Sequence, residues 1–201
     1  MREGWESRRN RMVERCISSP QEIAERYKKV GVVIFLVNSE GKILLVQEHS
    51  ENPNTGKESG TLGVICETSR EGEGWEETVV RGLSEELGID PGVEKEVFMI
   101  DPEGCFLGET LFIEGVLARV IVIHWRGDDR ELFSAKGDGE ISIVGWERPA
   151  FLISSPLKIR RGVEKVIQEC LAGGLLEGLT FNRGILKPLS VTNLEEITES
   201  F

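Results

Sequence analysis

The sequence predicts an α+β fold in which helices cover a mixed β-sheet. Apolar, β-branched runs alternate with two amphipathic helix patterns, in the order strands, helix, strands, helix. Elements in this order typically pack as layers around one core. The chain has 201 residues, of which 39% are hydrophobic and 29% are charged. This length and composition are typical of a globular protein with a real hydrophobic core.

The first strands are expected from residue 30 onward. Val30 to Asn38 is an apolar, β-branched run, and a turn over residues 39–42 leads into a second run, Ile43 to Gln47. Two such runs joined by a short turn predict a hairpin. The segment His49 to Gly60 is rich in Asn, Pro and Gly and predicts an exposed loop, after which Thr61 to Cys66 is a short strand.

Two later segments have the periodicity of amphipathic helices. Trp75 to Leu87 carries apolar residues three or four positions apart, and Gly88 stands where a helix C-cap belongs. Ile159 to Cys170 shows the same spacing. Between the two helices we expect strands over Val93 to Ile100, over Leu111 to Trp125, which is long enough to bend or to form two strands, and over Ile141 to Trp146.

The domain is expected to span residues 30–172, with extensions at 1–29 and 173–201. The N-terminal extension interleaves five arginines with glutamates and lacks an apolar run, so we interpret it as a surface segment, not a secretory signal. Gln21 to Lys29 is expected to form a short helix after Pro20. The C-terminal extension has a weak pattern and is expected to serve as a lid or in oligomerisation, as in a homodimer.

Charge and composition exclude several function classes. The net charge is −11, which argues against a general nucleic-acid binder, because phosphate contacts need clustered Lys and Arg. The longest apolar run, Val30 to Val37, is too short to cross a membrane. The four scattered cysteines contain no metal-binding pair and suit the reducing cytoplasm. An acidic protein can still bind polyphosphates when divalent cations lie between its carboxylates and the phosphates.

One acidic segment has the spacing for such chemistry. On the helix Trp75 to Leu87, Arg81 and Glu85 lie one turn apart and can pair, which would direct the carboxylate. The side chains of Glu85 and Glu86 diverge by about 100° and can flank a cation. Glu73, in the loop before the helix, can fold back toward them. Clustered carboxylates of this kind can bind a diphosphate through metal ions and activate a water.

The segment resembles the Nudix box, G-x5-E-x7-R-E-U-x-E-E-x-G-U, in which U is a bulky aliphatic residue. Glu67 to Ile89 fits this spacing without a gap and agrees at seven of the nine defined positions. The resemblance covers roughly Val30 to Leu171, including a later acidic segment that ends at Glu140. It implies an α/β/α sandwich with a mixed sheet between helices.

The chain departs from the box at two positions. Glu67 replaces a glycine, a change expected to alter the loop more than the metal site. Gly82 replaces a glutamate that the family often uses as a metal ligand or catalytic base, and a glycine within a helix costs about 1 kcal/mol relative to alanine. Either a bulky ligand needs the space or another carboxylate has taken over. Glu140 is the first candidate for that substitute, followed by Glu71 and Glu76.

By this resemblance the protein is a hydrolase that cleaves a pyrophosphate bond in a nucleoside diphosphate linked to another group. Its substrate would be a small-molecule nucleotide, and its cofactor Mg²⁺ or Mn²⁺. The resemblance implies that Arg81 orients a ligating glutamate. The candidate residues are Glu85, Glu86, Glu140 and Arg81 for catalysis, Glu85, Glu86 and Glu73 for the metal, and Arg70 and Lys57 for substrate phosphates.

Two other classes of function remain open at this point. A catalytically impaired Nudix-type module could bind and sense a nucleotide, and Gly82 favours this alternative. A pure interaction scaffold would need no site and would leave the regular spacing of the acidic residues to chance.

Overall fold

The computed structural model describes residues 27–91, 94, 97–100, 106–174, 176, 187 and 188. Most of the expected N-terminal extension and most of the C-terminal extension lie outside these residues. The expected helix over Gln21 to Lys29 also lies largely outside them, and its last residue, Lys29, begins a strand instead.

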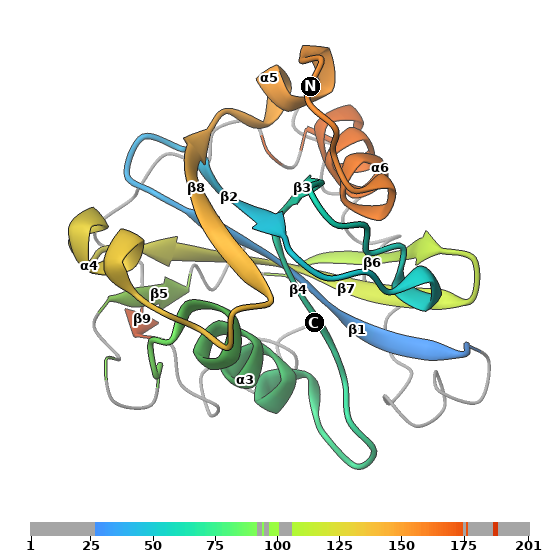
Figure 1. The fold of residues 1–201 in the computed structure, drawn as a ribbon, viewed down its shortest axis with the longest axis horizontal. Coiled ribbons are helices and arrows are strands. Elements are labelled where there is room, and N and C mark those ends of the chain that lie inside the picture. The colour runs from blue at the N-terminus through green and yellow to red at the C-terminus, as the bar shows by residue number, and fades with distance from the viewer. Residues whose placement is uncertain are drawn as a thin grey trace, which may run out of the picture.

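A mixed sheet forms the centre of the molecule (Figure 1). Its central strand β1 runs parallel to β7 and antiparallel to β2 and β4. On one side β2 pairs with β3 and β8, and on the other β7 pairs with β5 and β6, while β9 pairs with β5. The strands are β1 (Lys29–Val37), β2 (Ile43–Glu48), β3 (Leu62–Gly63), β4 (Ile65–Thr68), β5 (Phe98–Ile100), β6 (Phe106–Ile113), β7 (Val116–Trp125), β8 (Ile141–Glu147) and β9 (Lys187–Pro188).

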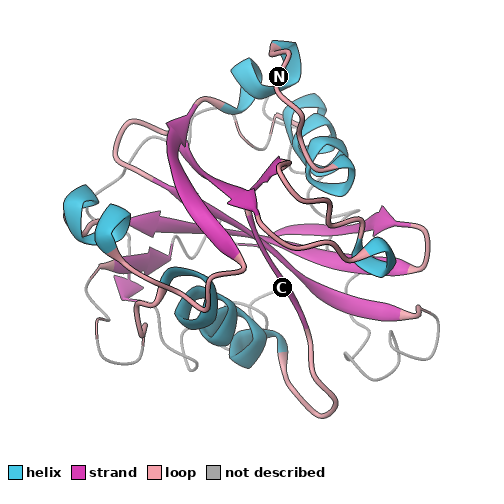
Figure 2. Ribbon diagram, viewed as in Figure 1, coloured by secondary structure: helices cyan, strands magenta, loops and turns pink. Residues whose placement is uncertain are grey.

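Helices cover both faces of this sheet (Figure 2). The helices are α3 (Trp75–Leu87), α4 (Asp129–Ser134), α5 (Pro149–Ser154) and α6 (Arg161–Ala172), with a 3-10 turn η1 (Pro53–Thr55). Val32 and Ile34 of β1 face the core under α3, whereas Val33 and Phe35 face the core under α6. From Val30 to Val37, β1 is buried on both faces and contains no polar side chain, as is typical of strands with parallel neighbours. The expected mixed sheet between helical layers is confirmed.

Most of the expected elements form where the pattern places them. The expected helix Trp75 to Leu87 has those bounds as α3, and Gly88 ends it with φ 67°. The expected strand Leu111 to Trp125 forms two strands, because the turn at Glu114 and Gly115 reverses the chain. The short helices α4 and α5 were not expected. Among the described residues, no helix has the length and apolar character needed to span a membrane.

A close backbone contact holds the loop before β8 against the C-terminal end of α3. The Asp138 N–H donates to the Glu85 carbonyl oxygen at 2.8 Å. A Cβ atom at Gly137 would lie 2.3 Å from the Glu86 carbonyl oxygen, so only glycine fits there. This contact brings the start of β8, with Glu140, beside the acidic end of α3.

Candidate active site

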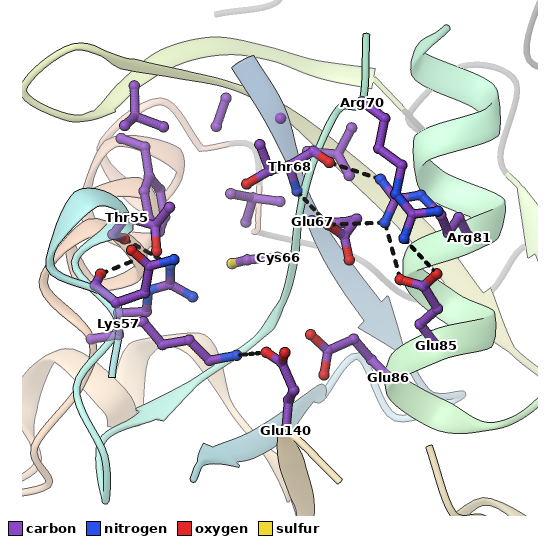
Figure 3. A pocket seen from close by; sticks show the side chains of 18 of the residues that line it. Thr55, Lys57, Cys66, Glu67, Thr68, Arg70, Arg81, Glu85, Glu86 and Glu140 are labelled. Carbon is purple, nitrogen blue, oxygen red and sulfur yellow. Dashed lines mark hydrogen bonds and ion pairs between the residues drawn. The ribbon is translucent and has the colours of Figure 1, made fainter. Parts of the chain in front are cut away.

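A polar pocket of about 270 Å³ lies between β1, β4, the loop around η1 and the C-terminal end of α3. Figure 3 shows Lys57 and Thr55 on one side of it and Arg81, Glu85 and Glu86 on the other. Six of the seven site residues expected from the sequence line this pocket, namely Lys57, Arg70, Arg81, Glu85, Glu86 and Glu140. The seventh, Glu73, is absent from the lining.

Arg81 contacts several carboxylates on one side of the pocket, which we call the acidic wall and which contains Glu67, Glu85 and Glu86. Its guanidinium donates to both oxygens of Glu73 at 2.7 and 2.8 Å, to Glu85 Oε2 at 3.1 Å and to the Thr68 carbonyl oxygen at 2.7 Å. It also pairs with Glu67 Oε1 at 3.0 Å. These carboxylates raise the pKa of Arg81, so its charge is permanent. Arg81 therefore fixes three carboxylates relative to α3 through the planar fork that only arginine offers.

Glu73 supports Arg81 from outside the pocket. Besides the two bonds from Arg81, its carboxylate accepts from the Arg70 N–H at 2.8 Å and from the Thr78 hydroxyl at 3.1 Å. The hydrogen bonds from Arg81, together with those from Arg70 and Thr78, lower the pKa of Glu73 to about 2 despite partial burial. Both oxygens are engaged, so the present geometry makes Glu73 a positioning residue for Arg81.

Glu85 is held by two arginines at the pocket rim. Arg70 donates to its Oε1 at 2.8 Å and Arg81 to its Oε2 at 3.1 Å. The Arg70 side chain is 64% exposed, so this ion pair contributes little to stability. Arg70 can therefore leave Glu85 for an anionic ligand at small energetic cost.

Glu86 is the most unusual side chain of the site. It is only 9% exposed, and its Oε2 atom has no hydrogen-bond partner within the part of the chain that the structure describes. Figure 3 shows its carboxylate directed into the pocket toward Glu140. Burial, together with the negative charges of Asp138, Glu48 and Glu67, raises the pKa of Glu86 to about 8, although Lys57 opposes this. A buried carboxylate without a partner is costly, which indicates a place for a positive ligand.

The opposite wall contains a network of charged side chains that is buried except at Glu140. Lys57 pairs with Glu140 at 2.5 Å and with Glu48 at 3.2 Å. Arg160 donates to Glu48 Oε1 at 2.8 Å and to the Thr55 carbonyl oxygen at 2.7 Å. Burial alone would lower the pKa of Lys57, but Glu140 and Glu48 outweigh it and raise that pKa. We call this side of the pocket, which contains Lys57 and Arg160, the cationic wall. It faces the acidic wall.

We expect Arg160→Met to lower the free energy of unfolding by about 2 kcal/mol. Glu48 is 2% exposed and would lose its shorter ion pair, keeping only the pair with Lys57 among the described residues. Urea denaturation at pH 7 measures the effect. Lys158→Met is the control, since both side chains of its ion pair with Glu58 are well exposed, and should change stability by less than about 0.5 kcal/mol. Equal losses in the two variants would contradict the structural role of Arg160.

Sequence reasoning missed three residues of the pocket region. Glu48 and Arg160 are 112 residues apart, and no sequence pattern relates them. Glu67 was expected to affect a loop, but it lies in strand β4 and its side chain lines the pocket. Its place in the motif was the available signal, because it is one of the two departures from the box.

The described carboxylates do not by themselves form a complete coordination shell for a metal ion. Within the part of the chain that the structure describes, no three His, Cys, Asp or Glu side chains converge closely enough to hold an ion by themselves. Mg²⁺, however, is usually bound by only one or two carboxylates, together with waters and substrate phosphates. The hard oxygen donors of the acidic wall and the unpartnered Oε2 of Glu86 fit such an ion.

A solved structure with a TM-score above 0.5, DR0079, supports this fold. No curated protein shows significant sequence similarity to the chain. The structure of DR0079 from Deinococcus radiodurans has a TM-score of 0.53 and 17% identity, over 72% of this chain and 85% of that one. A MutT structure, from work on Aliivibrio salmonicida and Vibrio cholerae, has a TM-score of 0.49 and 16% identity, over 72% and 97%. An ADP-ribose pyrophosphatase from Streptococcus suis has a TM-score of 0.45 and 18% identity, over 77% and 94%.

The family itself is shown by a sequence match. A family model described as the NUDIX domain matches residues 27–170, well over half of the chain. This match contains the whole acidic segment and both walls of the pocket. The chain therefore belongs to the Nudix hydrolase family.

Proposed function

We propose that this protein hydrolyses a pyrophosphate bond in a nucleoside diphosphate linked to another group, with Mg²⁺ or Mn²⁺ bound at the acidic wall. The observation that carries the proposal is Glu86, a nine-tenths buried carboxylate whose Oε2 has no hydrogen-bond partner in the described residues. Membership of the Nudix hydrolase family supports the reaction class. Structures named as MutT and as an ADP-ribose pyrophosphatase are among those with some likeness to this chain.

The metal would be held by Glu86, with Glu85 as its neighbour on α3. When bound, the ion would neutralise the diphosphate and lower the pKa of an attacking water. Glu85 is freed for this role when Arg70 moves to a substrate phosphate, while Arg81 keeps it oriented. Glu73 acts in this scheme through Arg81 and not as a direct ligand.

The cationic wall and Glu140 would act on the other side of the substrate. Lys57 lies close enough to Glu140 to hold its carboxylate toward the pocket, opposite Glu86. In the proposed reaction Lys57 transfers its hydrogen bond to a phosphate oxygen. Glu140 is then released to accept a proton from the attacking water, as a general base.

The proposal also covers the domain bounds, the C-terminal extension and the cellular location of the protein. We propose a domain at residues 30–172, a C-terminal extension at 173–201 that serves a homodimer or a lid, and a location in the cytoplasm. The free thiols of Cys66 and Cys170 support a reducing compartment.

A product assay tests the function directly. The protein is incubated with nucleoside diphosphate sugars, dinucleoside polyphosphates and nucleoside triphosphates, each with Mg²⁺ or Mn²⁺, and nucleoside monophosphate is quantified. We expect release from at least one substrate class, which stops when EDTA removes the metal. A folded protein that forms no monophosphate from any substrate with either ion would refute hydrolysis.

A nucleotide sensor is the second candidate. It is favoured by the ion pairs that occupy Glu85 and Glu140, because these pairs leave fewer carboxylates available to a cation. In this case the same panel yields ligand binding, measured by calorimetry, without product. The two outcomes separate a sensor from an enzyme.

A further inference from the structure

The two residues that depart from the Nudix box contact each other. Gly82 in α3 faces Glu67 in β4, and a Cβ atom on Gly82 would lie 2.9 Å from Glu67 Cβ and 3.3 Å from Glu67 Cγ. Real Cβ atoms essentially never approach other atoms within 3.0 Å. The side chain of Glu67 thus occupies the space that any side chain at position 82 would need. With this backbone, only one of the two positions can carry a glutamate.

This contact makes the two departures a single exchange. The box has glycine at the position of Glu67 and glutamate at the position of Gly82, and the chain has the reverse. The number of carboxylates near this part of the pocket is therefore preserved. What changes is the element that supplies the carboxylate, from the helix to the neighbouring strand.

The Glu67 carboxylate is placed for a role in the pocket. Its Oε1 accepts from the Thr68 N–H at 2.7 Å and pairs with Arg81 at 3.0 Å. Among the described residues, the hydrogen bond and the ion pair to this carboxylate both use Oε1, so Oε2 remains available for a ligand. Figure 3 shows the carboxylate beside Arg81, on the same side of the pocket as Glu86. Both side chains line the pocket.

Glu86 provides the independent sign that a cation belongs here. It is nine-tenths buried, its Oε2 has no hydrogen-bond partner among the described residues, and Figure 3 shows its carboxylate directed into the pocket. Two carboxylates, completed by waters and phosphate oxygens, are a sufficient protein contribution for Mg²⁺. Before substrate binds, Glu67 is better suited than Glu73 or Glu85 to be the second, because Glu73 has both oxygens engaged and Glu85 is paired with both Arg70 and Arg81.

We propose that Glu67 replaces the missing carboxylate of position 82 and, together with Glu86, binds the divalent cation of this protein. The inference rests on the proposed function, because it names a ligand of the same metal. It replaces Glu140 as the substitute ligand and leaves Glu140 its role as general base.

Mn²⁺ binding without substrate tests this assignment. The free Mn²⁺ signal in electron paramagnetic resonance gives the affinity of each metal-free variant. Glu67→Gln keeps the side-chain volume and is expected to weaken Mn²⁺ binding by at least about tenfold. Glu131→Gln, on the exposed surface of α4, is the matched control and should bind as the wild type does. Equal affinities of Glu67→Gln and Glu131→Gln would overturn the role of Glu67.

The reverse exchange tests whether the two positions are coupled. Glu67→Gly alone removes the carboxylate, and Gly82→Glu alone forces a clash, so each is expected to bind Mn²⁺ at least about tenfold more weakly. The double variant Glu67→Gly/Gly82→Glu should regain most of the lost affinity, because it returns the carboxylate to the helix without the clash. A double variant as weak as the weaker single variant would overturn the exchange.

The outcomes also separate this inference from the proposed function. A wild type that binds Mn²⁺ and hydrolyses a substrate, with Glu67→Gln equal to it in both assays, refutes the role of Glu67 alone. A folded wild type that neither binds Mn²⁺ nor forms product refutes the proposed function. Circular dichroism and thermal unfolding of each metal-free variant establish that the compared proteins are folded.

Discussion

Glu86→Gln is expected to abolish metal-dependent hydrolysis while it stabilises the metal-free protein. The loss of activity follows from the removal of the carboxylate that we propose as the central metal ligand. The gain in stability follows from the cost of burying an unpartnered charge, since glutamine is neutral and fills the same space. The two effects have opposite signs in one variant, and a merely structural residue would not produce this combination.

The higher stability of metal-free Glu86→Gln should depend on pH, because the pKa of Glu86 differs between the folded and the unfolded wild type. The folded protein raises this pKa from 4.5 to about 8, so the folded state binds the proton more tightly than the unfolded state does. The stability of the wild type therefore falls as the pH rises from about 4.5 to about 8, relative to the variant. At pH 7 the difference is on the order of 3 kcal/mol, and at pH 4 it disappears.

Urea denaturation of both proteins between pH 4 and pH 8 in EDTA measures this difference. Addition of Mn²⁺ should then stabilise the wild type, because the ion binds only the folded state, and should stabilise the variant much less. Retained hydrolysis in Glu86→Gln, or a stability gap that does not grow with pH, would be incompatible with the assignment of Glu86.

Arg81→Ala is expected to have the largest effect on stability, with a loss of about 4 kcal/mol at pH 7. Arg81 is only 13% exposed and pairs with Glu67, Glu73 and Glu85, so its removal leaves three carboxylates close together, of which Glu85 alone keeps a cation, Arg70. Hydrolysis should also fall sharply, because Glu85 loses the arginine that orients it. Arg81→Lys keeps the charge but not the fork, and should recover only part of both losses.

At acid pH the difference in free energy of unfolding between Arg81→Ala and the wild type should become smaller. Arg81 lowers the pKa of Glu73 to about 2, and the resulting stabilisation is complete above the ordinary pKa of 4.5. It is lost as the pH falls from about 4.5 to about 2. Urea denaturation at pH 7 and pH 3 measures the change, with Arg130→Ala on exposed α4 as the control. If the difference in free energy of unfolding is the same at both pH values, the ion pairs with the carboxylates are not the cause of that difference.

The fold was predictable from the sequence where the patterns were long. The thirteen residues of α3 show three turns of amphipathic spacing and end at a glycine, so both the helix and its end could be placed. The β1 run predicted a strand buried on both faces. By contrast, α4 and α5 have six residues each, too few to display a helical period.

From the sequence, only the site residues that belong to one contiguous motif could be placed near one another. The spacing from Glu67 to Ile89 placed Arg81, Glu85 and Glu86 near one another, and the structure brings them to one pocket wall. It could not relate Glu67 to Gly82, because their contact depends on how β4 packs against α3. Nor could it find Arg160, which reaches Glu48 from a distant loop.

The parallel pairing of β1 with β7 has a consequence for how the protein forms. Lys29 pairs with Val116, so the central contact of the sheet closes a loop of nearly ninety residues. Contacts this distant along the chain make folding slow compared with that of helical bundles. Since Arg160 lines the pocket, a chain emerging from the ribosome has no complete pocket until residue 160 has been synthesised.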